Sequence, residues 1–210
     1  MIRILIVDDH AIVRAGLKQI LADISDIEVS AEAASGDEAV LKLKMANWDM
    51  MLLDIAMPGR NVLEIIKLAK QHYPNKPILI LSMYPEDQYA VRMLRSGADG
   101  YLTKASAPEQ LVDAIFKLMQ GEKYISSTLA VQLLTSLNVE QKNCQHQILS
   151  DREFQVFLGI AKGLRLSEIA LNMALSIKTV STFRTRIMKK MRMASNSEII
   201  SYAIAHNLLN

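Results

Sequence analysis

The sequence has almost no cysteine and no long hydrophobic run, and each shortage excludes a class of protein. Cys144 is the only cysteine among 210 residues, so no internal disulfide can form, and no paired Cys/His spacing suggests structural zinc. The longest apolar stretches, such as 50–53 and 78–81, fall far short of the roughly 18 residues of a membrane span. The N-terminal stretch turns acidic at Asp8 and lacks a small-residue cleavage site, so we expect no signal peptide, no membrane partner and a cytoplasmic location.

The charge of the chain is unevenly distributed. Half of the residues are hydrophobic and 22% are charged, which is typical of a folded globular protein. From residue 150 to the end, nine basic side chains face four acidic ones, so this part carries about +5 and the rest about −3 of the total of +2. A basic C-terminal part suggests a polyanion as partner. Scattered solvated charge would give the same composition.

Hydrophobic periodicity predicts an α/β domain at the N-terminus. Short apolar runs rich in β-branched residues predict buried strands at 2–7, 27–33, 50–53, 78–82 and 100–102. Amphipathic segments between them predict helices at 11–22, 37–46, 62–72, 87–96 and 108–120. Because parallel neighbours need helical crossovers, this alternation predicts a doubly wound, five-stranded parallel sheet of the flavodoxin-like kind that ends near residue 123.

Beyond residue 123 the periodicity is helical. Residues 127–137 form a short helix candidate, and the polar stretch 138–147 is predicted to be a linker. Ser150 with Glu153 has a capping-box pattern, and Ser176 is a candidate N-cap. These signals belong to four predicted helices at 151–162, 167–174, 177–191 and 197–206. We therefore expect three parts: 1–123, a helical segment and linker at 124–147, and a small all-α four-helix domain at 148–210.

Polar residues gather at the carboxyl ends of the predicted strands, where ligands bind in doubly wound sheets. They are Asp8, Asp9, Asp54, Ser82 and Lys104. Crowded carboxylates repel unless cations are present, and Lys104 with a hard divalent ion, most simply Mg2+, would supply the charge. Such a site can bind a phosphoryl group and leave one carboxylate, best Asp54, as the nucleophile. A single Asp at a strand end is more often a turn or helix cap, but the complete set is improbable as coincidence.

The segment 165–191 has the layout of a helix-turn-helix, whose second helix enters the major groove of DNA. In its second helix, Ile177, Val180, Ile187 and Met191 form the expected inward stripe, and Phe183 shares it partly. The opposite face carries side chains suited to phosphates and base edges, namely Lys178, Ser181, Thr182, Thr185, Arg186 and Lys189. An ordinary solvated helix face is the alternative.

Residues 1–123 resemble the receiver domain of two-component response regulators. The matching words are ILIVDDH at 4–10, LLDIAMPG at 52–59, LS at 81–82 and GADGYLTK at 97–104. The resemblance implies that Asp54 accepts phosphate from a sensor histidine kinase and that Lys104 contacts that phosphate. It also implies a Mg2+ site at Asp8, Asp9, Asp54 and the Ala56 backbone carbonyl, and a switch pair of Ser82 and Tyr101. We expect His10 to be a local hydrogen-bonding residue rather than a phosphate carrier.

Residues 148–209 resemble the LuxR-type helix-turn-helix of the NarL/FixJ group. The words are LSDRE at 149–153, AKG at 161–163, EIA at 168–170 and LSIKTVSTFRTRI at 175–187. The resemblance implies double-stranded DNA as partner, with base contacts from Ser181, Thr182 and Thr185 and phosphate contacts from Lys178, Thr179, Arg184, Arg186 and Lys189. The usual N-cap before the EIA word is replaced by Arg165, and Phe183 stands where His or Tyr is usual.

These observations predict a phosphorylation-dependent transcription regulator that is not an enzyme and that forms a homodimer when phosphorylated. Two alternatives compete with it. A phosphatase of the haloacid dehalogenase type also uses aspartate and Mg2+, but it needs Asp-x-Asp where this chain has Asp54-Ile55-Ala56. A constitutive DNA-binding protein with a degenerate receiver is disfavoured by the intact set of Asp8, Asp9, Asp54, Ser82 and Lys104.

Overall fold

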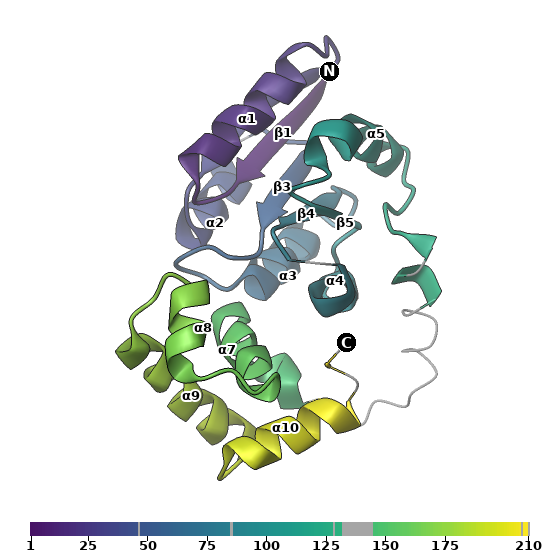
Figure 1. The fold of residues 1–210 in the computed structure, drawn as a ribbon. Coiled ribbons are helices and arrows are strands. Elements are labelled where there is room, and N and C mark those ends of the chain that lie inside the picture. The colour runs from purple at the N-terminus through teal and green to yellow at the C-terminus, as the bar shows by residue number, and fades with distance from the viewer. Residues whose placement is uncertain (46, 85, 128, 132–144, 207, 210) are drawn as a thin grey trace. The chain divides into compact units, whose positions relative to one another are not determined.

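The computed structural model describes residues 1–45, 47–84, 86–127, 129–131, 145–206 and 208–209. The chain splits into two compact units, Met1–Asn138 and Val139–Asn210 (Figure 1), and each is considered by itself. Most of the helix expected at 127–137 and of the linker expected at 138–147 lies outside the described residues, as does Cys144. Within the described ranges, no helix combines the length and the apolar character needed to cross a membrane.

The first unit is a five-stranded parallel sheet with the order β2-β1-β3-β4-β5. Its strands are β1 (Ile2–Val7), β2 (Ile27–Ala33), β3 (Met50–Asp54), β4 (Ile78–Ser82) and β5 (Gly100–Thr103). The crossover helices are α1 (Ala11–Ala22), α2 (Gly36–Met45), α3 (Val62–His72) and α4 (Glu86–Arg95), and α5 (Ala107–Met119) follows the last strand. This confirms the expected doubly wound fold, and every end lies within one residue of its prediction.

Alternating strand residues bury both faces of this sheet. Ile4 and Ile6 of β1 belong to a cluster that includes Leu17 and Leu21 of α1 and Leu111 of α5, so these helices cover one face. Leu5, Val7 and other residues of opposite parity are also buried, as expected for a sheet covered on both sides. Each such side chain contributes on the order of 1.5–3 kcal/mol, so the strand ends that carry the polar residues rest on a rigid base.

The chain just after α5 packs against the first unit. Tyr124 forms an isolated parallel bridge with Gly100 of β5. Two residues further on, the Ser126 hydroxyl donates to a carboxylate oxygen of Glu86 in α4 at 2.6 Å, and the Ser126 amide donates to the other at 3.3 Å. The start of the segment that follows the expected boundary at residue 123 is therefore attached beside β5 and α4.

The second unit consists of short helices. They are the 3-10 helix η1 (Gln145–Ile148) and the α-helices α7 (Asp151–Ala161), α8 (Leu166–Asn172), α9 (Ile177–Met191) and α10 (Asn196–Ala205). The predicted capping box is confirmed: the Glu153 amide donates to the Ser150 hydroxyl at 3.3 Å, and the Ser150 amide donates to Glu153 at 2.7 Å. Ser176 likewise caps α9 by accepting from the Thr179 amide.

The start of α9 corrects one prediction. Val180, Ile187 and Met191 are buried, as expected for the inward stripe, but Ile177 is 55% exposed. Ile177 is the first residue of α9, and helical side chains tilt toward the N-terminus, so its side chain extends beyond the first turn instead of into the core. The preceding helix also ends two residues earlier than predicted, because Ala174 adopts a left-handed φ of 52°.

Candidate functional site

The carboxyl ends of β1 and β3 bring two aspartates together. Val7 pairs with Leu53 in the sheet register, so the residues that follow, Asp8 and Asp54, lie at the same edge. Both side chains are only 2% exposed, whereas Asp9 is 24% exposed. Two buried carboxylates at one sheet edge need nearby positive charge to remain ionised.

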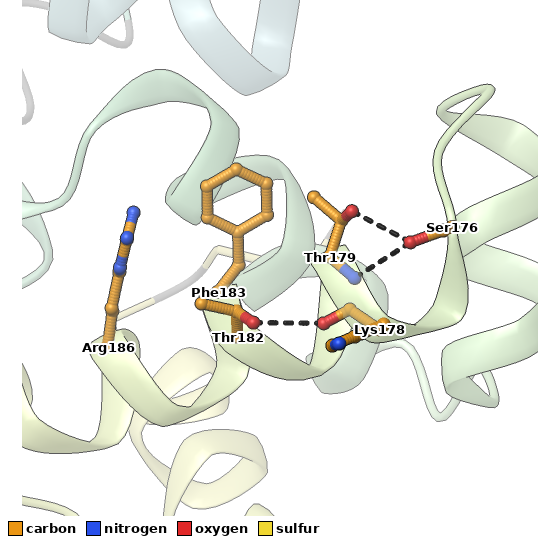
Figure 2. A pocket seen from close by; sticks show the side chains of 6 residues that line it. All are labelled: Ser176, Lys178, Thr179, Thr182, Phe183 and Arg186. Carbon is orange, nitrogen blue, oxygen red and sulfur yellow. Dashed lines mark hydrogen bonds between the residues drawn. The ribbon is translucent and has the colours of Figure 1, made fainter.

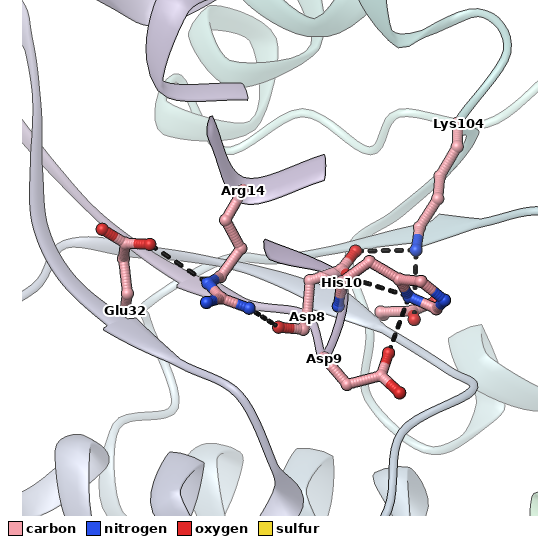
Figure 3. Close-up of polar contacts among 7 residues, drawn as sticks. Asp8, Asp9, His10, Arg14, Glu32 and Lys104 are labelled. Atoms are coloured by element: carbon pink, nitrogen blue, oxygen red, sulfur yellow. Dashed lines mark hydrogen bonds and ion pairs between the residues drawn. The ribbon is translucent and has the colours of Figure 1, made fainter. Parts of the chain in front are cut away.

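Lys104, one residue beyond β5, supplies part of that charge. Its ammonium faces the Asp8 carboxylate (Figure 3), at 2.6 Å from Oδ2. The same ammonium lies 3.1 Å from Asp54 Oδ2, and the Lys104 backbone amide donates to the Ser82 carbonyl. Burial would lower the pKa of Lys104, but the neighbouring Asp54 and Asp8 carboxylates outweigh burial and raise it. Lys104 therefore remains a cation at the centre of the site, joined to Ala105 by a trans peptide bond.

The pKa of the Asp54 carboxyl is raised by its surroundings. Burial raises its pKa, Lys104 opposes this, Asp8 adds to it, and a hydrogen bond with the Ala56 backbone opposes it, with a net rise. The buried oxygens Asp8 Oδ2, Asp9 Oδ1 and Asp54 Oδ2 lie within ion-pair distance of Lys104 or His10, yet none accepts a hydrogen bond of acceptable geometry. Buried oxygens in this condition fit a hard cation, which prefers carboxylate and carbonyl ligands.

His10 completes the cluster at the start of α1. Its backbone amide donates to Asp8 Oδ1 at 2.8 Å, and its Nδ1 lies 3.3 Å from the same oxygen, which confirms the predicted local hydrogen bonding. Nδ1 is also 2.8 Å from Asp9 Oδ1. Among the described residues, Asp8, Asp9, His10 and Asp54 form the one group whose potential ligand atoms all lie within 4.8 Å of one another.

Arg14 and Glu32 hold the backbone of the site, and neither was predicted from the sequence. Arg14, on α1, donates through one guanidinium nitrogen to the Asp8 carbonyl at 2.7 Å and through Nε to Glu32 at 3.1 Å. Lys18 donates to the other oxygen of Glu32 and, with Arg14, keeps the pKa of Glu32 low despite its burial. The sequence offers only a weak signal for these contacts. Arg14 lies six residues after Asp8, and its bridge between the Asp8 carbonyl and Glu32 can be recognised only once β2 is known to flank β1.

Ser82 and Tyr101 meet at the backbone of one residue. The buried Ser82 hydroxyl accepts from the Tyr84 amide at 3.0 Å, and the Tyr101 hydroxyl donates to the Tyr84 carbonyl at 2.9 Å. Tyr101 is only 3% exposed. The two residues predicted as a switch pair are thus connected through the Tyr84 peptide groups.

The second unit exposes most of the predicted DNA-contacting residues along α9. Lys178, Thr182, Thr185, Arg186 and Lys189 are exposed, and their spacing of about one helical turn puts them on one side of the helix. An open pocket of about 290 Å³ lies on this side (Figure 2). It is lined by Ser176, Lys178, Thr179, Thr182, Phe183 and Arg186.

The predicted contact residues differ in burial and in the hydrogen bonds that they already make within the protein. Arg184 donates from Nε to Asn196 at the start of α10 at 2.8 Å, and Ser181 is partly buried. The Thr182 and Thr185 hydroxyls donate back to the carbonyls of Lys178 and Ser181. These threonine oxygens therefore present acceptor lone pairs outward, which suits donors on base edges.

Lys190 fastens α9 to α7 and was not predicted. Its ammonium donates to Glu153 Oε2 at 2.6 Å, the same oxygen that accepts from the Ser150 amide in the capping box. Burial raises the pKa of Glu153, but the hydrogen bonds from Lys190 and Ser150 outweigh burial and lower it. Lys190 thus has a structural partner, although it lies beside the exposed Lys189.

The fold and the site together define a class of protein: a receiver with buried aspartates at one sheet edge, followed in the same chain by a helix-turn-helix. Residues 4–116 match the family described as response regulator receiver domain. Residues 147–203 match the family described as bacterial regulatory proteins, luxR family.

Several known response regulators are similar to this chain over nearly its whole length. The chain is 36% identical to response regulator UvrY of Escherichia coli K12, over all of this chain and 97% of the relative. It is 36% identical to response regulator GacA of Pseudomonas viridiflava, over all of this chain and 99% of the relative. RcsB of Salmonella enterica serovar Typhimurium, solved on a promoter with a phosphomimetic, aligns with a TM-score of 0.57 and 25% identity over 96% of this chain and 98% of that one. The chain belongs to the response regulators with a LuxR-type DNA-binding domain, which regulate transcription under the control of phosphorylation.

Proposed function

We propose that Asp54 is the phosphate acceptor and that its phosphorylation by a sensor histidine kinase controls DNA binding by the second unit. The observation that carries this proposal is the position of Asp54: its side chain is 2% exposed at the sheet edge, and its Oδ2 lies 3.1 Å from the Lys104 ammonium. Asp54 is modified once and later restored, so we regard the protein as a regulator and not as an enzyme that turns over a substrate.

The transfer step follows from this geometry. An oxygen of Asp54 forms a bond to phosphorus while the bond between phosphorus and the kinase histidine nitrogen breaks, and the departing imidazole keeps the electron pair. Lys104 neutralises charge that develops on the phosphoryl oxygens. Mg2+, when bound, supplies further positive charge, and the residues proposed to hold it are Asp8, Asp9, Asp54 and the Ala56 carbonyl.

The switch is proposed to start at Ser82. A phosphate on Asp54 offers the Ser82 hydroxyl a charged acceptor, which is a stronger partner than a neutral group. Ser82 presently accepts from the Tyr84 amide, and Tyr101 donates to the Tyr84 carbonyl. A change at Ser82 therefore acts on the amide of Tyr84, the residue whose carbonyl accepts from Tyr101, and so reaches β5 and the start of α4.

For the second unit, the proposed boundary is residues 148–210, after a receiver at 1–123 and a connecting part at 124–147. Lys178, Thr179, Arg184, Arg186 and Lys189 are proposed to contact phosphates, and Ser181, Thr182 and Thr185 to contact bases. One such helix buries little surface, so tight binding needs two copies on paired half-sites. RcsB has been solved as dimers on DNA, which supports a homodimer here. Because bacterial DNA lies in the cytoplasm, the proposed function supports a cytoplasmic location.

Phosphate uptake from a small acyl-phosphate donor with Mg2+ tests the acceptor. The full-length protein should take up about one phosphate per chain, because one carboxylate is placed for attack. Asp54→Asn should take up none, whereas Asp37→Asn, which changes an aspartate that is 67% exposed, should behave like the parent. Uptake by Asp54→Asn at the parent level would assign the acceptor elsewhere.

Footprinting then tests the coupling to DNA. The phosphorylated protein should protect paired half-sites about one helical turn apart more strongly than single ones, and binding should steepen with protein concentration. Equal protection of single and paired half-sites, with and without phosphate, would refute dimerisation as the mechanism.

A further inference from the structure

His10 occupies a helix-capping position without capping the helix. It is the N-cap residue of α1, yet its side chain makes no capping hydrogen bond. Ser, Thr, Asp or Asn is preferred at such a position because a short polar side chain can accept from the first turn. The imidazole instead turns toward the carboxylates of Asp8 and Asp9 (Figure 3). The His10 side chain remains 58% exposed.

The contact between His10 and Asp9 lacks a hydrogen bond. Nδ1 lies 2.8 Å from Asp9 Oδ1, but that oxygen accepts no hydrogen bond of acceptable geometry. The nearest oxygen with hydrogen-bond geometry is Asp8 Oδ1, at the longer distance of 3.3 Å. Two atoms that both present lone pairs repel at this distance, so without an ion a proton on Nδ1 separates them. A divalent cation that binds here would take the place of that proton.

The set of donor atoms differs from that of a purely oxygen site. One atom each from Asp8, Asp9, His10 and Asp54 lies within 4.8 Å of all the others. Opposite ligands of an ion held at about 2.1 Å are about 4.2 Å apart, so side-chain movements of a few tenths of an ångström would close the set. Asp9 and His10 are the more exposed members and can make that adjustment.

We propose that His10 is a further metal ligand of the receiver, which broadens the ion preference of the site from Mg2+ toward first-row transition ions. The inference rests on the proposed metal site at Asp8, Asp9 and Asp54. Mg2+ favours carboxylate, carbonyl and water oxygens, whereas imidazole favours ions later in the first-row series. An imidazole that adds little to Mg2+ affinity therefore adds much to Co2+ affinity.

Calorimetric titration of the full-length protein with Mg2+ and with Co2+ tests this assignment. His10→Ala should raise the dissociation constant for Co2+ by at least about tenfold, the lower end of what even an outer-shell partner contributes. The constant for Mg2+ should change by less than about twofold, because the oxygen ligands remain. His10→Asn, which offers an amide oxygen, should keep the Mg2+ value and still lose the Co2+ gain.

Two control variants test whether the expected effects are specific to His10 and to this metal site. His72→Ala changes an exposed histidine at the end of α3 and should leave both constants unchanged. Asp9→Ala removes a proposed ligand and sets the background from metal bound elsewhere. Equal losses for both ions in His10→Ala, or no loss for either, would overturn the assignment of His10 while leaving the Asp54 proposal to the uptake test. Absence of Mg2+ binding by the unaltered protein would overturn both.

Discussion

The receiver and the DNA-binding unit both depend on a few charged side chains, but the two units expose them to opposite degrees. Asp8, Asp54 and Lys104 follow or end three different strands, and each side chain is at most 8% exposed. Lys178 and Arg186 come from a single helix and are exposed. Buried charges interact strongly and act as a unit, whereas exposed charges are screened by salt and act almost independently.

This difference predicts how substitutions behave in each unit. In the receiver, the loss of one group changes the environment of all the others, because few solvent molecules can replace it. Along α9, the loss of one cation removes one ionic contact and leaves its neighbours as they were.

Lys104→Ala should uncouple phosphorylation from DNA binding. Phosphorylation of the unaltered protein should tighten DNA binding by about 5- to 150-fold, the range of typical coupling free energies. The variant should lose most of this gain, because the cation nearest Asp54 is missing. Fluorescence anisotropy with and without the acyl-phosphate donor measures the gain. Lys123→Ala, which removes a lysine 57% exposed, is the matched control, and an unchanged gain in Lys104→Ala would contradict the proposed role.

Lys190→Met should destabilise the second unit, whereas Lys189→Met should not. Removal of the Lys190 ammonium leaves the buried Glu153 carboxylate with one charged partner fewer. Because Lys190 is 41% exposed, we expect a loss of about 1–2 kcal/mol in the free energy of unfolding, below the range for a fully buried pair. Urea unfolding followed by circular dichroism measures it. Equal stability of the two variants would mean that solvent screening at Lys190 removes the contribution of the Lys190–Glu153 ion pair to the free energy of unfolding.

The same pair predicts a pH dependence. The pKa of Glu153 is lowered in the folded protein, so its contribution to stability is complete above the unfolded value of about 4.3 and is lost as pH falls through the lower folded value. The stability difference between the unaltered protein and Lys190→Met should therefore be constant near pH 7 and shrink below about pH 4. A difference that persists at lower pH would point to packing of the lysine stem.

The sequence was sufficient wherever a signal is local or a motif is contiguous. The strands, the capping box at Ser150 and the inward positions of Val180 and Ile187 follow from periodicity and capping chemistry. Contacts between distant segments could not be read in this way. The hydrogen bond from Arg14 to the Asp8 carbonyl depends on the position of Glu32 in a neighbouring strand, and the Lys190 contact depends on how α9 crosses α7. Ile177 fitted the helical stripe but is the first residue of α9, where its side chain is 55% exposed.

The smallest expected effects separate two kinds of residue on α9. Lys178→Ala should weaken binding to all DNA sequences about equally and reduce the slope of log affinity against log salt by about one, because one phosphate contact is lost. Thr182→Ala should leave that slope unchanged and cost on the order of 1 kcal/mol of discrimination at one base pair. The Thr182 hydroxyl already donates to the Lys178 carbonyl, so the lost group is an acceptor, and the affected position should be one where the base presents an amino donor.

Titrations of matched duplexes that differ at single positions, each at several salt concentrations, measure both quantities. Ser181→Ala is the informative comparison, because Ser181 is partly buried and should cost less discrimination than Thr182→Ala if depth in the groove decides base reading. If Thr182→Ala instead weakens binding to all sequences about equally, with the salt dependence unchanged, then the Thr182 hydroxyl lies against the DNA backbone. In that case the second unit would recognise its sites through DNA shape instead of through a base contact from Thr182. The exposed side chains of α9 would then act separately on the DNA backbone, in contrast to the buried charges of the receiver, which act as a unit.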